Sequence, residues 1–231
     1  MEYGYLSATD YVGISFWLAT AMMLASTVFF FVERQDVALK WRTSMTVAGL
    51  VTGMAFWHYL YMRGMWINVG ETPTVFRYID WLITVPLQII EFYLITSAII
   101  NVRSSIFWRL LVASLVMLGF GYFGETGLMD TTHGFIIGTL AWLYIIYEIF
   151  FGATAAANRA TANKASQLAF TYIKWIVTVG WAIYPIGYAL GYLSPYGNLD
   201  LLNITYNLAD LVNKTAFGLA IWYAAKLDST S

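Results

Sequence analysis

Two carboxylates lie eleven residues apart in an otherwise apolar stretch that begins at Arg77. Each residue of a helix turns about 100° and rises about 1.5 Å, so Asp80 and Thr84 share one face. Glu91 returns to nearly the same face roughly 16 Å further along. Ionisable side chains inside a membrane segment mark ion pathways and proton relays. Two acids on one stripe at two depths therefore predict successive stations for a proton.

A second candidate site surrounds Lys214, near the middle of another apolar stretch. An unpaired ammonium is costly there, and Asp210 lies one helical turn earlier on the same face. One interpretation is a structural ion pair between helices. The other is a lysine that forms a Schiff base with an aldehyde, with Asp80 and Asp210 available as counterions to the protonated imine. The lysine alone does not decide between them.

Aromatic residues bear on that choice. Trp181, Tyr184 and Tyr188 recur at one-face helical spacing, Pro185 can kink their helix, and Trp81 lies beside the first acid. An aromatic stripe ordinarily packs one helix against another. Packing alone does not account for a buried lysine with acids nearby, whereas a long, flat, conjugated aldehyde between indole rings accounts for both. Such an aldehyde is retinal.

The composition indicates which elements hold these residues. Of 231 residues, 60% are hydrophobic and 11% are charged, against roughly 25% charged in a soluble domain. The mean hydropathy is +0.65. These values predict an all-α membrane protein, and since a crossing helix needs about 20 residues, the length accommodates seven spans with short loops in one domain, residues 1–231.

Other classes of function find little support in the composition. The net charge of −1 gives no electrostatic reason to expect nucleic acid. Without cysteine there is no disulfide, thiolate catalyst or cysteine metal site. An enzyme in the usual sense is not expected, because we find no nucleophile–base arrangement, phosphate loop or metal cluster. The first five residues carry no basic charge and show no signal peptide.

Hydropathy and turn residues divide the chain into seven expected spans. We place them at about Tyr11 to Val32, Trp41 to Met62, Thr74 to Ile100, Ser105 to Phe123, Thr131 to Phe151, Leu168 to Leu193, and Leu201 to Ala225. The Ala-rich stretch from Gly152 to Gln167 is the longest expected loop.

Basic residues predict the orientation of these spans. On one side they flank the loops and the C-terminus, namely Arg34, Lys40, Arg42, Arg103, Arg109, Arg159, Lys164 and Lys226. The opposite side has only Arg63 near its loops. The positive-inside rule therefore predicts an outside N-terminus and a cytoplasmic C-terminus. Asp80 then lies nearer the outside, and Glu91 nearer the cytoplasm.

Several motifs together carry a resemblance to a known family. They are Arg77-Tyr-Ile-Asp80-Trp-Leu, Thr84-Val-Pro, Glu91-Phe-Tyr, Trp181-Ala-Ile-Tyr-Pro185 and Leu208-Ala-Asp210-Leu-Val-Asn-Lys214. In combination they resemble the microbial rhodopsins, most closely the proteorhodopsins, across all seven spans. The resemblance implies seven helices around all-trans retinal, bound covalently to Lys214 as a protonated Schiff base. It also implies a light-driven outward proton pump in the bacterial inner (plasma) membrane, assembled as a homo-oligomer, a pentamer or hexamer.

The resemblance further implies a role for each acid. Asp80 resembles the proton acceptor and primary counterion, Asp210 the second counterion, and Glu91 the cytoplasmic proton donor, while Thr84 completes the family's Asp-Thr-Glu triplet. Elementary electrostatics agrees with this division. Arg77, one turn before Asp80, favours its charged form, whereas apolar neighbours keep Glu91 protonated.

Two further polar residues are expected near the ligand. A buried histidine is ordinarily a packing residue, but the resemblance places His58 beside Asp80, and we expect a hydrogen bond between them. Gln88 would ordinarily join two helices. In the proteorhodopsins, glutamine at this position accompanies blue absorption and leucine accompanies green, so the resemblance implies a blue-absorbing form. The expected ligand contacts are Lys214, Trp81, Gln88, Trp181, Tyr184, Pro185 and Tyr188.

Other charged residues lie near the ends of the expected spans. Glu125 and Asp130 flank a turn on the outer side and are expected to be solvated, with Glu125 a candidate for proton release. Glu148 and Lys174 are expected to pair with each other or to extend toward the membrane surface.

Three alternatives to a proton pump stay open at this stage. A slow-cycling light sensor that signals through a partner protein needs no fast cytoplasmic donor, so Glu91 argues against it. Chloride pumps lack the acceptor acid and sodium pumps use Asn-Asp-Gln, so the Asp-Thr-Glu set departs from both. A transporter without retinal would use Lys214 and Asp210 as a structural ion pair only.

Overall fold

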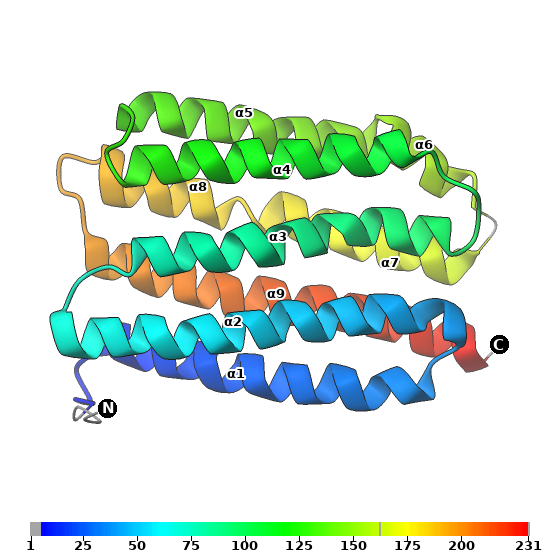
Figure 1. Cartoon of the computed structure of the whole chain (residues 1–231), viewed down its shortest axis with the longest axis horizontal. Coiled ribbons are helices and arrows are strands. Elements are labelled where there is room, and N and C mark those ends of the chain that lie inside the picture. Colours follow the sequence, from blue (N-terminus) through cyan, green and yellow to red (C-terminus); the bar gives the residue numbers. More distant parts are fainter. Residues whose placement is uncertain (1–5, 162, 231) are drawn as a thin grey trace.

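Seven long helical spans lie side by side in the computed structural model, which describes residues 6–161 and 163–230 (Figure 1). The first five residues, which bear on the question of a signal peptide, lie outside the described residues. Six spans are α1 (Tyr11–Glu33), α2 (Arg42–Val69), α3 (Thr74–Ser97), α4 (Ser104–Glu125), α5 (Thr131–Phe150) and α9 (Leu199–Thr230), and the remaining span contains α7 (Lys164–Trp175) and α8 (Ile183–Tyr188). The expected seven-helix architecture is confirmed.

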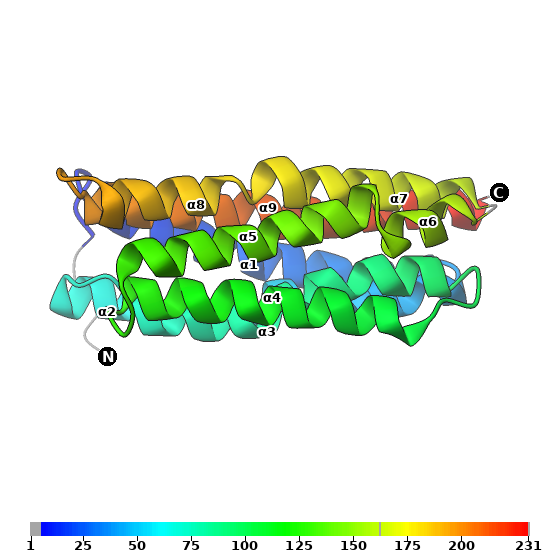
Figure 2. The same ribbon diagram turned by 90° about the horizontal axis from the view of Figure 1, so that it is seen from above.

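All of these spans run along the long axis of the molecule in both views (Figures 1 and 2). Because the number of spans is odd, α1 begins at one end of the bundle and α9 ends at the other. Short 3₁₀ turns, η1 (Arg34–Asp36) and η2 (Leu39–Trp41), join α1 to α2. The third and seventh spans bury the candidate acids and lysine, namely Asp80, Glu91, Asp210 and Lys214.

Composition explains why two spans differ from the rest. Among the described residues, five helical stretches are long and apolar enough to cross a membrane: Tyr11–Asp36, Thr74–Ser97, Ser104–Glu125, Thr131–Arg159 and Lys164–Leu193. The other two spans, α2 and α9, are equally long but more polar. Helix α9 carries its polar residues on the buried face, at Asn203, Asn207, Asp210, Asn213 and Lys214. The chain is therefore a multi-pass membrane protein whose polar groups face inward.

Local signals fix several helix ends. Side-chain oxygens cap the first turns of α1, α5 and α7, with Asp10 accepting from Gly13 N, Asp130 from His133 N and Asn163 from Ser166 N. The second span runs to Val69, beyond the expected end at Met62. It stops there because Gly70 adopts the left-handed conformation (φ 72°) that ends a helix at low cost.

The sixth span is not the single helix expected from Leu168 to Leu193. After α7 the backbone widens into a π-helical turn, η3 (Ile176–Gly180), and a second such turn, η4 (Ala189–Leu193), follows α8. The break lies one turn before Pro185, which has no N–H to donate to the Trp181 carbonyl. That carbonyl instead accepts from Tyr184 N at 3.1 Å.

The prediction of a loop from Gly152 to Gln167 is wrong for most of that stretch. It contains a short helix, α6 (Ala153–Arg159), and α7 already begins at Lys164, while residue 162 lies outside the described residues. Alanine is the strongest helix former. In addition, the Glu148 carboxylate accepts a hydrogen bond from Ala153 N at 3.1 Å, which supports the first turn of α6.

Candidate functional site

Helices α3 and α9 bring the predicted lysine and acids together. The Lys214 side chain is only 2% exposed, and its Nζ donates to Asp210 Oδ2 at 3.0 Å. It also donates to Asp80 Oδ2 on α3, and both carboxylates are fully buried. Because Asp210 and Lys214 are four residues apart on one helix, their contact follows directly from helix geometry. The contact with Asp80 requires the packing of α3 against α9.

Asp210 is held from several directions. Besides Lys214, its carboxylate accepts hydrogen bonds from Tyr59 at 3.0 Å, from Tyr184 at 2.7 Å and from Trp81 Nε1 at 3.1 Å. These donors come from α2, α8 and α3. A carboxylate with this many donors has a fixed position and little unused acceptor capacity.

Asp80 has far fewer partners. Its Oδ2 accepts from Lys214, but within the described part of the chain its Oδ1 has no hydrogen-bond partner. The Thr84 hydroxyl donates to the Asp80 backbone carbonyl at 2.9 Å and not to its carboxylate. Asp80 therefore has one carboxylate oxygen without a short hydrogen bond, and His58 Nδ1 lies 3.5 Å from it.

His58 lies against Asp80, as expected, at the outer limit of hydrogen-bond distance. His58 Nδ1 lies 3.5 Å from Asp80 Oδ1, within ion-pair distance. The same nitrogen lies 2.8 Å from the Met54 carbonyl, which can only accept, so Nδ1 donates along its own helix. The expected proximity is present, but the proton of Nδ1 is already engaged.

Arg77 joins the third and seventh spans one turn before Asp80. It is fully buried, and its two terminal nitrogens donate to Asn207 and Asn203 at 3.0 Å each. Its guanidinium carbon also lies 5.3 Å from the centre of the Tyr206 ring, a cation–π distance. Among the described residues Arg77 forms no ion pair, so it acts on the acids through space.

Glu91 occupies a different environment further along α3. It is 1% exposed, and its carboxyl oxygens make no hydrogen bond of ordinary geometry among the described residues, although the Ser44 side chain of α2 lies near them. The next residue, Phe92, packs edge-on against Phe170 of α7, with ring centres 5.1 Å apart. A buried carboxyl without an ion pair is costly in its ionised form. The two acids of α3 therefore differ in environment, as the sequence suggested.

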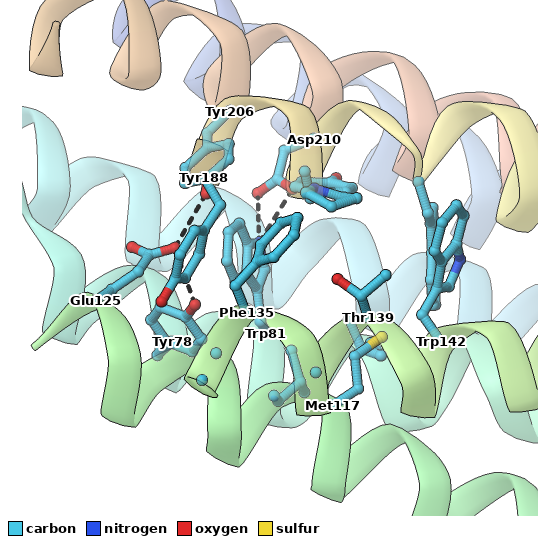
Figure 3. A pocket seen from close by; sticks show the side chains of 18 of the residues that line it. Tyr78, Trp81, Met117, Glu125, Phe135, Thr139, Trp142, Tyr188, Tyr206 and Asp210 are labelled. Atoms are coloured by element: carbon cyan, nitrogen blue, oxygen red, sulfur yellow. Dashed lines mark hydrogen bonds between the residues drawn. The ribbon is translucent and has the colours of Figure 1, made fainter. Parts of the chain in front are cut away.

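A pocket lies on the inner side of α3, α8 and α9. All seven expected ligand contacts line it, namely Lys214, Trp81, Gln88, Trp181, Tyr184, Pro185 and Tyr188. The Trp81 and Tyr184 rings meet edge-on, with centres 5.2 Å apart. Figure 3 shows Trp81 and Asp210 near its middle and Trp142 at one end.

Sequence reasoning missed the opposite wall of the pocket, which α4 and α5 provide. Its residues are mostly apolar or small: Met117, Leu118, Gly121, Gly134, Phe135, Gly138, Thr139 and Trp142. The glycines were the available signal, because small residues in membrane helices permit close approach. A Cβ at Gly134 would lie 2.8 Å from the Gly124 Cα, so α4 and α5 are in backbone contact there.

The expectation that Glu125 is solvated is wrong. Helix α4 continues to this residue, which turns its half-buried side chain to the inner face, where it lines the pocket. Its Oε1 accepts from Tyr78 at 2.9 Å and from Tyr206 at 3.0 Å (Figure 3). Asp130 matches the expectation, because its side chain is 61% exposed and caps α5.

Glu148 and Lys174 do not pair with each other. Glu148 is buried and accepts from Arg109 at 3.4 Å and from Tyr144 at 3.1 Å. The Lys174 ammonium lies 4.4 Å from the centre of the Phe150 ring, another cation–π contact. Both residues serve the packing of α4, α5 and α7.

The residues present fit retinal. An aromatic slot with a buried primary amine in its wall suits a conjugated aldehyde that can condense with that amine. Two carboxylates beside the amine, Asp80 and Asp210, can balance the charge of a protonated imine. Gln88 also lines the slot, and its buried Nε2 has no hydrogen-bond partner within the described residues, as expected where a ligand completes the surroundings.

Seven membrane-spanning helices around a buried lysine and an aromatic pocket define the class of the rhodopsins. The chain matches the sequence profile of bacteriorhodopsin-like proteins over residues 10–227, and it belongs to that family.

Particular members of the family are similar over nearly the whole chain. A green-light absorbing proteorhodopsin from Gamma-proteobacterium EBAC31A08 is 59% identical over 229 residues, which cover 99% of this chain and 92% of the relative. A blue-light absorbing proteorhodopsin from Gamma-proteobacterium Hot 75m4 is 57% identical over 230 residues, covering 99% and 91%. The crystal structure of blue light-absorbing proteorhodopsin from Med12 is 69% identical, with a TM-score of 0.84, covering 94% of this chain and 99% of that chain. The resemblance to the proteorhodopsins is confirmed.

Proposed function

We propose that this protein is a light-driven outward proton pump with retinal bound to Lys214. The observation that carries the proposal is the contact of one buried amine with two unequal carboxylates. Lys214 Nζ bonds to both Asp80 and Asp210, yet only Asp80 retains an oxygen without a hydrogen-bond partner among the described residues. The similarity to green- and blue-light absorbing proteorhodopsins supports the same function.

Lys214 would hold all-trans retinal as a protonated Schiff base, which would supply the absorption of light and an acidic N–H beside the two carboxylates. Asp80 accepts a proton at its carboxylate, because the nearest donor to Oδ1 that the structure records is His58 Nδ1 at 3.5 Å, too far for a strong hydrogen bond. Asp210 stays in place as the second counterion, since Tyr59 and Tyr184 hold it. The difference in partners therefore selects the acceptor.

Glu91 holds a proton on the cytoplasmic side of Lys214 and gives it to the Lys214 nitrogen once in each cycle. It lies roughly 16 Å from Asp80 along α3, too far for direct transfer between the two acids. Its carboxyl forms no ion pair among the described residues, so no ion pair opposes the release or recovery of its proton. Opposite environments for Asp80 and Glu91 give the transfer its direction.

The basic residues support the orientation that makes the pump outward. With the N-terminus outside and the C-terminus in the cytoplasm, Asp80 faces outward and Glu91 inward. The bacterial source of the proteorhodopsin relative agrees with a bacterial inner membrane as the location, and assembly as a pentamer or hexamer is proposed from the resemblance to the family.

The position of Gln88 supports the proposal that this protein absorbs blue light. It lines the pocket with an amide nitrogen that has no protein hydrogen bond in the described chain. A polar amide beside a conjugated cation changes the energy of its excited state relative to its ground state. The 69% identical structure is of a blue light-absorbing protein, which agrees with this reading.

The deciding experiment is the pH of a suspension of cells that express the chain with all-trans retinal. Illumination is expected to acidify the medium, and a protonophore is expected to abolish the change. Lys214→Ala serves as the control without pigment. If pigment forms but light changes no pH, the pump is refuted and a light sensor becomes the better reading.

A further inference from the structure

The break in the sixth span is held by side chains from the helices on either side. In the π-helical turn Ile176–Gly180, the Val177 carbonyl accepts from Trp142 Nε1 of α5 at 3.0 Å. The Gly180 carbonyl accepts from Asn213 Nδ2 of α9 at 2.9 Å. Such turns leave backbone carbonyls without their usual helical partners, and these two donors replace them.

Both donors are tied to the pocket. Trp142 is part of its wall, and so is Trp181, the residue that follows Gly180. Asn213 directly precedes Lys214 on α9. The fit of Asn213 against the break is close, since a Cβ at Gly180 would lie 2.9 Å from the Asn213 Cγ. A movement of the Lys214 backbone therefore acts directly on the Gly180 carbonyl.

The helix beyond the break packs against α3 beside Glu91. Helix α7 packs Phe170 against Phe92, the residue after Glu91, with ring centres 5.1 Å apart. Ser166 of α7 donates to the Ile95 carbonyl of α3 at 2.8 Å. Both contacts lie on the cytoplasmic side of Glu91 in the proposed orientation. A shift of α7 away from α3 would therefore open a path for water to this carboxyl.

The far end of α7 is anchored separately. Asn163, which caps α7, donates through Nδ2 to Asp228 of α9 at 2.9 Å. The cytoplasmic half of the sixth span is thus fixed to α9 at two points, Asn213 at the break and Asp228 at the tip. Between those points, α7 contacts α3 beside Glu91 through Phe170 and Ser166.

We propose that Asn213 is a positioning residue that clamps the sixth span closed and controls access to Glu91. The inference rests on the proposed pump. When the turn of α9 that holds Lys214 moves, Asn213 moves with it and releases the Gly180 carbonyl. Helix α7 then moves about the break, and the Phe170–Phe92 contact opens. Re-formation of the Asn213–Gly180 hydrogen bond closes the path again.

The expected effect of losing the clamp is moderate. One neutral intramolecular hydrogen bond changes an equilibrium by about fivefold. Asn213→Leu keeps the approximate size of the side chain and removes the donor, so α7 is expected to open more often. The Glu91-dependent recovery of the pigment after a flash is then expected to accelerate by about fivefold. In a Glu91→Gln background the acceleration is expected to disappear.

Four companion variants separate clamping from general loosening. Asn213→Gln retains an amide donor and is expected to restore the recovery rate to within about twofold. Gly180→Ala disturbs the contact from the other side and is expected to have the same effect as Asn213→Leu. It takes the place of Asn213→Leu in the test if Asn213→Leu forms no pigment. Ser26→Ala removes a 3.0 Å contact between α1 and Thr215 of the same helix α9 and is the matched control, with no acceleration expected. Trp142→Phe removes the second donor and is expected to accelerate recovery as well.

A direct measurement of α7 completes the test. The chain contains no cysteine, so Lys164→Cys on α7 and Ser105→Cys on α4, both exposed, give a unique pair of spin labels. Light is expected to lengthen the label distance in the otherwise unchanged protein, and Asn213→Leu is expected to shift the dark distance toward the illuminated value.

Each outcome bears on one hypothesis. If the unchanged protein forms pigment but pumps no protons, the proposed function fails, whatever the variants do. If it pumps, but Asn213→Leu or Gly180→Ala leaves recovery and label distance unchanged, the clamp is wrong. Equal acceleration by Ser26→Ala, or no rescue by Asn213→Gln, would also overturn it.

Discussion

Asp80 and Asp210 share one ammonium but differ in what else holds them. Lys214 Nζ bonds to both, whereas Tyr59, Tyr184 and an indole bond to Asp210 alone. The two carboxylates are equally buried, so burial does not distinguish them. Their hydrogen-bond partners do, and this asymmetry decides which acid is free to accept a proton.

The acceptor assignment predicts the phenotype of Asp80→Asn. The variant removes a negative charge beside the protonated imine, which stabilises the excited state relative to the ground state, so the absorption maximum is expected to move to the red. It also removes the acceptor, and proton transport is expected to fall roughly 100-fold or more. Absorption spectra and light-induced pH changes measure the two effects. Continued pumping by Asp80→Asn would remove this residue from the acceptor role.

The donor assignment predicts a different phenotype for Glu91→Gln. The amide has the same shape but cannot donate the proton, so recovery after a flash is expected to slow roughly 100-fold. The colour is expected to change little, because Glu91 does not line the pocket. Flash photolysis at neutral pH checks the rate, and added azide, a small diffusible acid, is expected to restore it. An unchanged rate without azide would contradict the assignment.

The polar part of the site was predictable because burying charged side chains in apolar helices costs free energy unless they are paired. Lysine and aspartate inside apolar helices must be paired, and the four-residue spacing of Asp210 and Lys214 places them on one face. The pairing with Asp80 follows from charge balance, and the structure contains it. These residues stand out from their surroundings by type alone, so spacing was enough to group them.

The apolar wall and the helix ends were harder to predict. Met117 and Leu118 of α4 look the same in sequence whether they face lipid or ligand, since both environments are apolar. Glu125 was misplaced because the end of α4 was expected at Phe123, and two more residues of helix turn its side chain inward. The contact of His58 with Asp80 was predicted, but it is long, at 3.5 Å, for a finer reason. The Met54 carbonyl, one turn earlier, competes for the same nitrogen.

Gln88 provides a test of colour that is independent of proton transfer. Gln88→Leu removes the unpartnered amide from the pocket, and the absorption maximum is expected to move to the red while outward pumping continues. Met117→Leu on the opposite wall is the matched control, because it changes an apolar side chain for another of similar size. A spectrum of Gln88→Leu that matches the unchanged protein would exclude Gln88 from tuning.

The Glu125 cluster predicts an effect on stability. Glu125→Ala leaves the hydroxyls of Tyr78 and Tyr206 without their shared acceptor, and unpaired buried polar groups cost about 1–3 kcal/mol. The free energy of unfolding is expected to fall by about that amount, and the midpoint of thermal bleaching to fall with it. Glu71→Ala, at an exposed position in the α2–α3 connection, is the control, with an effect of less than about 0.5 kcal/mol. Equal midpoints for the two variants would mean that the tyrosines find other partners and that Glu125 does not anchor α4 to α3 and α9.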